Sequence, residues 1–127
     1  MSGAGASLDG LRILIVEDES LVAHFLAELL AVFGCQVAGI AETVAASLAL
    51  IDAPGADFDG VLLDINLNGE TVYPVADRLV ALQLPFAFVT GYEESAIDPR
   101  FSTVPILRKP FRPPELAALV ASIAIRR

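Results

Sequence analysis

The chain has 127 residues, about the length of one domain, and 55% of them are hydrophobic, which is enough to fill a sizeable core. Its 16 acidic and 8 basic residues give a net charge of −8, which argues against a nucleic-acid partner because domains that bind nucleic acid are usually basic. No apolar run approaches the roughly 18 residues of a membrane helix, and the first ten residues lack the pattern of a signal peptide, so we expect a cytoplasmic protein with no membrane partner.

Short apolar runs alternate with helical patterns along the chain. The first strand is predicted at residues 11–16, and the next apolar residues, Phe25 among them, recur at helical spacing up to Gly34. A weaker strand at residues 35–41 leads to a helix that Thr43 can cap. The remaining predicted elements are a strand at 61–63, a helix from Pro74 with Val75, Leu79 and Leu82 on its inner face, strands at 86–89 and 104–107, and a helix from Pro113.

Continuous apolar strands separated by helices indicate a parallel sheet that is covered on both faces. Pro105 lies inside the last predicted strand, which places that strand at an edge, and the weak strand at 35–41 suits the other edge. A doubly wound, five-stranded α/β sheet in the flavodoxin-like order 2-1-3-4-5 satisfies both constraints. We expect this domain to cover residues 11–127 after a flexible tail at residues 1–10, with a fourth helix that is short or poorly formed.

Polar side chains follow four of the predicted strands at their carboxyl ends. The first strand ends in Glu17-Asp18, the third in Asp64, the fourth in Thr90-Gly91 and the fifth in Arg108-Lys109. In an open parallel sheet, ligands bind beyond these ends, at the point where the strand order reverses, which here lies between the first and third strands. Three acids, a hydroxyl and an ammonium are therefore predicted to meet on one rim.

This set of groups suits the transfer of a phosphoryl group. Three carboxylates in close proximity repel one another, and Mg²⁺ relieves this repulsion while still accepting phosphate and water as ligands. Lys109 adds a second positive centre beside Asp64, so that carboxylate is prepared to attack phosphorus and form an aspartyl phosphate. Thr90 can donate a hydrogen bond to the phosphoryl oxygens, and Gly91 leaves room for them and offers its backbone amide.

Four short motifs resemble the receiver domain of two-component response regulators, the CheY-like family, over essentially the whole predicted domain. They are VED (16–18), LLDINL (62–67), VTGY (89–92) and RKPF (108–111). The resemblance implies that Asp64 is the phosphoacceptor, that Thr90 is the switch hydroxyl and that Lys109 is the phosphate-binding lysine. It also implies a cis Lys109–Pro110 peptide, which aims the ammonium into the site.

The resemblance also implies the ligands of a Mg²⁺ ion. Asp18, Asp64 and the backbone carbonyl of Asn66 would bind the ion directly, and Glu17 would contribute through water. Glu17, Asp18 and Asp64 already belong to the acids predicted at the strand ends, and the resemblance adds the backbone oxygen of Asn66.

The chain departs from most receivers at the switch. Ile106 stands three residues before Lys109, where an aromatic gate is usual. This change and the stretch PFAFVTGY (85–92) resemble the FAT GUY subfamily, whose kinases are of the HWE and HisKA2 types. We expect Thr90, Tyr92 and Ile106 to form the switch, with the ring of Tyr92 partly replacing the missing gate.

These features predict a stand-alone response regulator. It would accept a phosphoryl group from a sensor histidine kinase or a phosphotransfer protein and signal through contacts with a downstream protein. It would not be an enzyme acting on a separate substrate, although it would catalyse its own phosphorylation and autodephosphorylation. One alternative is a phosphate sink or shuttle in a phosphorelay. Another is a pseudo-receiver, a binding module that is never phosphorylated, but such a module should have lost an acid, the hydroxyl or the lysine.

Overall fold

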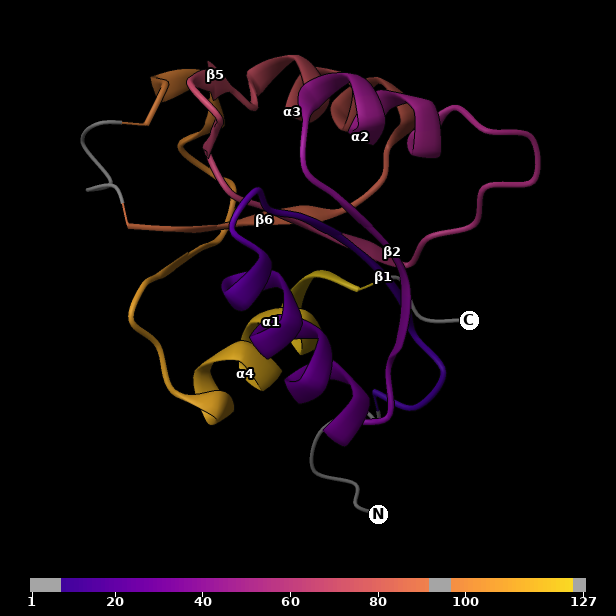
Figure 1. The fold of residues 1–127 in the computed structure, drawn as a ribbon, viewed down its shortest axis with the longest axis vertical. Coiled ribbons are helices and arrows are strands. Elements are labelled where there is room, and N and C mark those ends of the chain that lie inside the picture. The colour runs from indigo at the N-terminus through magenta and orange to yellow at the C-terminus, as the bar shows by residue number, and fades with distance from the viewer. Residues whose placement is uncertain (1–7, 92–96, 125–127) are drawn as a thin grey trace.

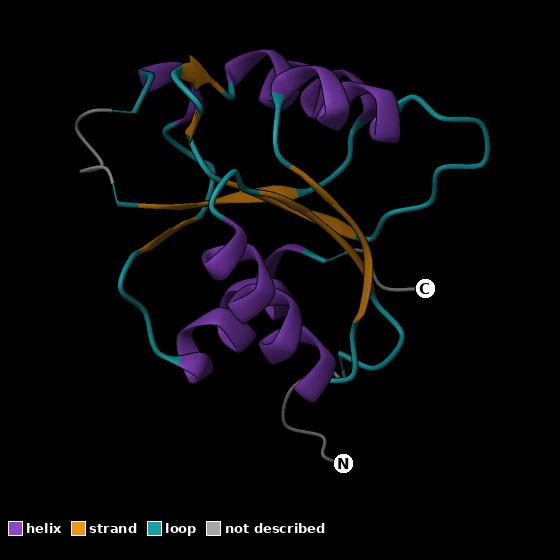
Figure 2. Ribbon diagram, in the orientation of Figure 1, coloured by secondary structure: helices purple, strands orange, loops and turns teal. Residues whose placement is uncertain are grey.

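A parallel sheet of five strands forms the middle layer of the fold (Figure 1), seen in a computed structural model that describes residues 8–91 and 97–124. In sheet order the strands are β2 (Gln36–Ala41), β1 (Arg12–Val16), β3 (Gly60–Leu63), β6 (Phe86–Thr90) and β7 (Ile106–Arg108). Helices α1 (Ser20–Val32) and α4 (Pro113–Ile123) cover one face, and α2 (Val44–Ile51) and α3 (Tyr73–Leu82) cover the other (Figure 2). The predicted order of the five parallel strands is confirmed.

Two apolar cores lie on opposite faces of this sheet. Successive side chains of a strand point to opposite faces, so Ile13 and Ile15 of β1 pack toward α1 and α4, whereas Leu14 and Val16 pack toward α2 and α3. All four of these side chains are at most 1% exposed. Burial on both faces explains why the central strands are continuously apolar instead of alternating with polar residues.

Helix α2 begins at the cap that the sequence predicts. The Thr43 hydroxyl accepts a hydrogen bond of 3.0 Å from the backbone N–H of Ala46, one of the amides that the first turn of a helix leaves without a partner. Replacement of Thr43 by Ala should lower the free energy of unfolding by about 1 kcal/mol. Thr43→Ser should keep most of the stabilisation that the cap contributes, because it keeps the hydroxyl. Urea unfolding of the two variants tests this, and equal stability of both would show that the cap contributes nothing.

Three details differ from the predicted elements. Strand β7 begins at Ile106, so Pro105 precedes the strand, although its carbonyl still accepts the N–H of Phe88 at 2.9 Å. Phe25 is 44% exposed because Ala23, Leu26 and Leu30 form the buried face of α1. Leu82 is 40% exposed because it ends α3, where Gln83 takes a left-handed conformation and turns the chain, and the inner face is completed by Ala76 instead.

A short helix precedes β7 in the segment where the fourth helix was expected to be short. It is a 3₁₀ helix, η2 (Pro99–Phe101), and residues 92–96 lie outside the described part of the chain. Phe101 is 4% exposed and stacks on Tyr73 of α3 with ring centroids 5.4 Å apart. The Tyr73 hydroxyl accepts the backbone N–H of Asp98 at 3.0 Å. This segment is therefore anchored to α3.

Part of the predicted N-terminal tail is described in the structure. Residues 1–7 lie outside the described part, Leu8 packs against the core on the α1 side, and the N–H of Gly10 donates to the carbonyl of Gly34 at 2.8 Å. Each helix within residues 8–91 and 97–124 is too short or too polar to cross a bilayer.

Candidate functional site

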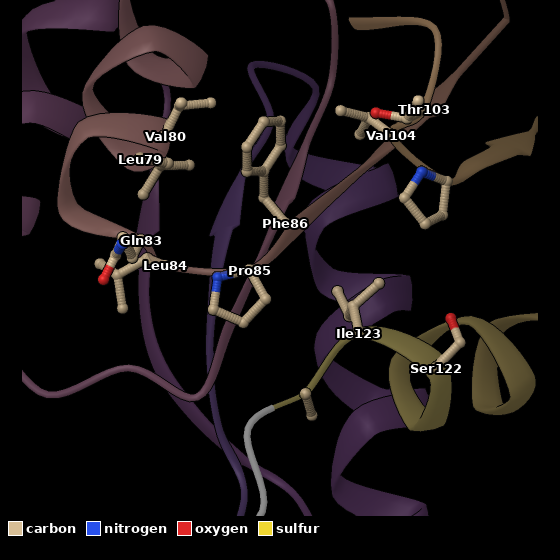
Figure 3. Close-up of a pocket in the computed structure, with 12 residues that line it drawn as sticks. Leu79, Val80, Gln83, Leu84, Pro85, Phe86, Thr103, Val104, Ser122 and Ile123 are labelled. Atoms are coloured by element: carbon tan, nitrogen blue, oxygen red, sulfur yellow. The ribbon is translucent and has the colours of Figure 1, made fainter.

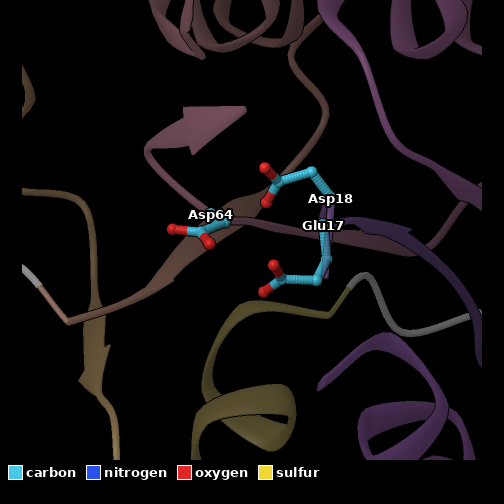
Figure 4. A group of neighbouring side chains, drawn as sticks. All are labelled: Glu17, Asp18 and Asp64. Atoms are coloured by element: carbon cyan, nitrogen blue, oxygen red, sulfur yellow. The ribbon is translucent and has the colours of Figure 1, made fainter. Parts of the chain in front are cut away.

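Three acids emerge side by side where β1 and β3 end. The backbone N–H of Asp64 donates to the carbonyl of Val16 at 2.9 Å, and that of Glu17 donates to the carbonyl of Ala41 at the same distance, so the sheet ladder extends to both acids. The side chains of Glu17, Asp18 and Asp64 point toward one another (Figure 4). Each places a carboxylate oxygen within 4.8 Å of the others.

Lys109 reaches the same point from the end of β7. Its backbone N–H donates to the carbonyl of Thr90 at 2.9 Å, which extends the β6–β7 pairing beyond Arg108. Its ammonium donates to Glu17 Oε1 at 2.8 Å and to Asp64 Oδ2 at 3.0 Å. The Lys109–Pro110 peptide is cis, as the resemblance to receivers implied.

Burial and hydrogen bonding together set the charges of this ion pair. Glu17 is 1% exposed, and its burial raises its pKa to about 7 although hydrogen bonds from Lys109 and from the Glu19 N–H oppose the change. Burial alone would lower the pKa of Lys109, but its hydrogen bonds to Glu17 and Asp64 outweigh that effect and raise the pKa above its ordinary value. The lysine therefore stays charged, and a metal cation close by would favour the charged form of Glu17.

The three carboxylates differ in how many of their oxygens accept hydrogen bonds from the protein. Within the described residues, both oxygens of Glu17 accept hydrogen bonds, from Lys109 and from the Glu19 N–H at 3.1 Å. Asp18 and Asp64 each accept through Oδ2, from the Asn68 N–H and from Lys109. Clustered oxygen ligands of this kind fit a hard divalent cation such as Mg²⁺. Asp18 and Asp64 each have an oxygen to offer such an ion directly.

A cavity of about 410 Å³ brings most of the predicted site residues together. It is lined by Asp18, Glu19, Asp64, Asn66, Thr90, Gly91 and Lys109. Thr90 is fully buried, and a side chain added at Gly91 would meet no atom of the described residues within 4 Å, so these residues leave space beside Gly91.

Ile106, one residue of the expected switch, is not among the residues that line this cavity. Ile106 is half-buried in β7, pairs with Phe88 and packs against the core on the α2–α3 side. Tyr92 lies outside the described residues.

A larger hollow of about 540 Å³ lies at the other end of β6. Side chains from α3, β6 and α4 surround it, including Leu79, Phe86 and Ile123 (Figure 3). Its lining contains no acid, base or nucleophilic thiol. Among the described residues, the clustered carboxylates and the ammonium lie at the acidic rim instead.

Two backbone donors at the rim were missed by sequence reasoning. The N–H groups of Glu19 and Asn68 hold the carboxylates of Glu17 and Asp18. Asn68-Gly69 forms the turn of a hairpin between β4 (Asn66–Leu67) and β5 (Glu70–Thr71), with φ of 52° and 89°. Asn-Gly is the commonest sequence of a two-residue hairpin turn, so this dipeptide was a usable signal.

Residues 13–121 match the model of the family described as the response regulator receiver domain. The chain belongs to this family. The resemblance that the four motifs indicated is thereby confirmed, and the fold is that of a CheY-like receiver of two-component signalling.

Several known proteins are similar to this receiver domain. The phyllosphere-induced regulator PhyR of Methylorubrum extorquens is 30% identical over 120 residues, which are 87% of this chain and 42% of PhyR, so the chain spans less than half of that relative. The solution structure of SdrG from Sphingomonas melonis Fr1 has a TM-score of 0.78 and 40% identity over 89% of this chain and 95% of SdrG. The BeF3-activated conformation of SdrG from Pseudomonas melonis Fr1 has a TM-score of 0.74 and 39% identity over 87% and 93% of the two chains.

Proposed function

We propose that this receiver domain accepts a phosphoryl group on Asp64 from a histidine kinase or a phosphotransfer protein and then signals through protein contacts. The observation that carries the proposal is the placement of Asp64, Thr90 and Lys109 around one cavity, with the ammonium 3.0 Å from the carboxylate. The pseudo-receiver alternative is disfavoured because the acids, the hydroxyl and the ammonium are all present at the rim.

The proposed step is a displacement at phosphorus. An oxygen of the Asp64 carboxylate attacks, the bond between phosphorus and the donor's imidazole nitrogen breaks, and its electron pair leaves with that nitrogen. Lys109 neutralises charge on the phosphoryl oxygens from a position already beside Asp64. The Thr90 hydroxyl donates a hydrogen bond to one of these oxygens, and the open space at Gly91 receives the group.

A Mg²⁺ ion belongs to this proposal as a cofactor. Asp18, Asp64 and the backbone carbonyl of Asn66 would hold it directly, and Glu17 would hold it through water because both Glu17 oxygens already accept protein hydrogen bonds. When bound, the ion supplies a second positive charge that stabilises the transferring phosphoryl group. Within the described residues, the Asp18 carboxylate accepts a hydrogen bond from the Asn68 amide, whereas Lys109 donates to Glu17 and Asp64.

Replacement of Asp18 by Ala should remove measurable Mg²⁺ binding in the absence of phosphate. The variant loses one of the two acids of the cluster that have an oxygen for the ion, and a Mg²⁺ site with one or two carboxylates depends strongly on each of them. Calorimetric or NMR titration measures the affinity. Glu28→Ala is the matched control, because it removes one exposed acidic charge from α1 and should leave the affinity unchanged. Equal affinity of Asp18→Ala and the control would place the metal elsewhere.

Phosphorylation by a small donor tests the proposed function directly. Incubation with acetyl phosphate and Mg²⁺ should add the mass of one phosphoryl group, and hydroxylamine should remove it because the product is an acyl phosphate. A chain that gains no phosphoryl mass, or that gains one stable to hydroxylamine, would contradict the proposal. Phosphotransfer profiling against HWE and HisKA2 kinases would then test the kinase type that the FAT GUY resemblance suggests.

A further inference from the structure

The turn of the β4–β5 hairpin contacts the acidic rim. The backbone N–H of Asn68 donates to Asp18 Oδ2 at 2.9 Å and so joins two residues that are 50 positions apart in the sequence. Within the described residues this is the hydrogen bond that the Asp18 carboxylate accepts. A hydrogen bond to an ionised group is roughly twice as strong as one between neutral groups, so it can orient the side chain.

The hairpin is anchored at its base and shaped at its tip. Leu67 and Val72 are fully buried, which ties the base to the core. At the tip, Asn68 and Gly69 both have positive φ, and Asn66 Oδ1 accepts the Gly69 N–H at 3.0 Å. The direction of the Asn68 N–H therefore depends on a left-handed backbone at an exposed residue.

The lysine and two backbone N–H groups hold the three acids of the rim. Lys109 holds Asp64, and Lys109 together with the Glu19 N–H holds Glu17. The donor of Asp18 lies in an exposed hairpin turn, so a substitution there replaces neither a core side chain nor the lysine.

We propose that Asn68 is a positioning residue for the cation site. Its N–H holds the Asp18 carboxylate in the orientation in which one oxygen lies within 4.8 Å of oxygens of Glu17 and Asp64. The proposal rests on the proposed function, since the cation is that of the same site. Because coupling between two binding events is reciprocal, a cation bound by Asp18 should also stabilise the turn conformation in which the Asn68 N–H donates to Asp18.

Two substitutions at Asn68 test this with one exposed position. Asn68→Gly keeps the N–H and accepts positive φ, whereas Asn68→Val keeps the N–H but disfavours the left-handed backbone. The Mg²⁺ dissociation constant of the full chain should rise about tenfold in Asn68→Val, the size typical for loss of a group that orients a metal ligand. It should stay within about twofold of the wild type in Asn68→Gly.

Amide hydrogen exchange gives a second readout that uses the wild-type chain. Mg²⁺ should slow exchange of the Asn68 N–H, and Asp18→Ala should speed that exchange and remove the effect of Mg²⁺. In chelator, Asn68→Gly should unfold at nearly the wild-type temperature, and Asn68→Val should unfold cooperatively at a somewhat lower one, because a β-branched residue is strained at positive φ.

The outcomes separate this proposal from the one on which it rests. If the wild type binds Mg²⁺ and is phosphorylated, but Asn68→Val binds as tightly as the wild type, the positioning role is wrong and the proposed function stands. The same holds if Mg²⁺ leaves the exchange of the Asn68 N–H unchanged. If the wild type shows neither Mg²⁺ binding nor phosphorylation, the proposed function fails, and the positioning role fails with it.

Discussion

Replacement of Asp64 by Asn should abolish phosphorylation by acetyl phosphate. The amide has nearly the shape of the carboxylate but lacks its nucleophilic oxygen, so we expect the rate to fall by at least about 10³-fold. Asp64 is 9% exposed at the mouth of the sheet, and the same-sized side chain should preserve the packing around it. Intact-mass measurement after incubation with the donor and Mg²⁺ gives the result.

Asp52→Asn is the matched control for this experiment. It makes the same chemical change on an exposed acid that pairs with Arg78 on the α2–α3 side of the sheet, and such exposed pairs contribute little to stability. The control should be labelled like the wild type. Labelling of Asp64→Asn at the wild-type level would assign the nucleophile to another residue.

Replacement of Lys109 by Ala should separate phosphorylation from metal binding. The ammonium lies 2.8 Å from Glu17 and 3.0 Å from Asp64, where it competes with a cation for the same acids. Its loss should leave Mg²⁺ affinity unchanged or increase it, because the repulsion between the two positive centres is removed. Phosphorylation should slow by roughly 10²- to 10³-fold, the usual effect of removing a group that stabilises developing charge.

Arg108→Ala controls for the loss of one positive charge. Arg108 is exposed and precedes Lys109 in the chain, so this variant changes the net charge equally and keeps the ammonium in the cavity. It should be phosphorylated like the wild type in the acetyl phosphate assay. A collapse of Mg²⁺ affinity in Lys109→Ala would show that the lysine supports the metal site instead of the phosphoryl group.

Some features of this protein follow from its sequence by local rules. Continuous apolar runs between helical patterns indicate a doubly buried parallel sheet, and such a sheet has its ligand site where the strand order reverses. Residues that end the strands, such as Asp18, Asp64 and Lys109, could therefore be assigned to one rim before any contact was known. The rim is a consequence of topology, and topology is encoded in the order of the elements.

Other features depended on contacts between distant residues. Periodicity shows that a helix has an apolar face but not how far that face extends over the core, so Phe25 and Leu82 were wrongly expected to be inward. The hydrogen bonds that hold the acids were also invisible, because they join residues such as Asn68 and Asp18 through a backbone amide that every residue except proline carries. By itself, the sequence determined which acids, hydroxyl and ammonium share the rim. The tertiary structure decided which oxygen of each acid is already occupied, since that depends on where the folded chain places its backbone donors.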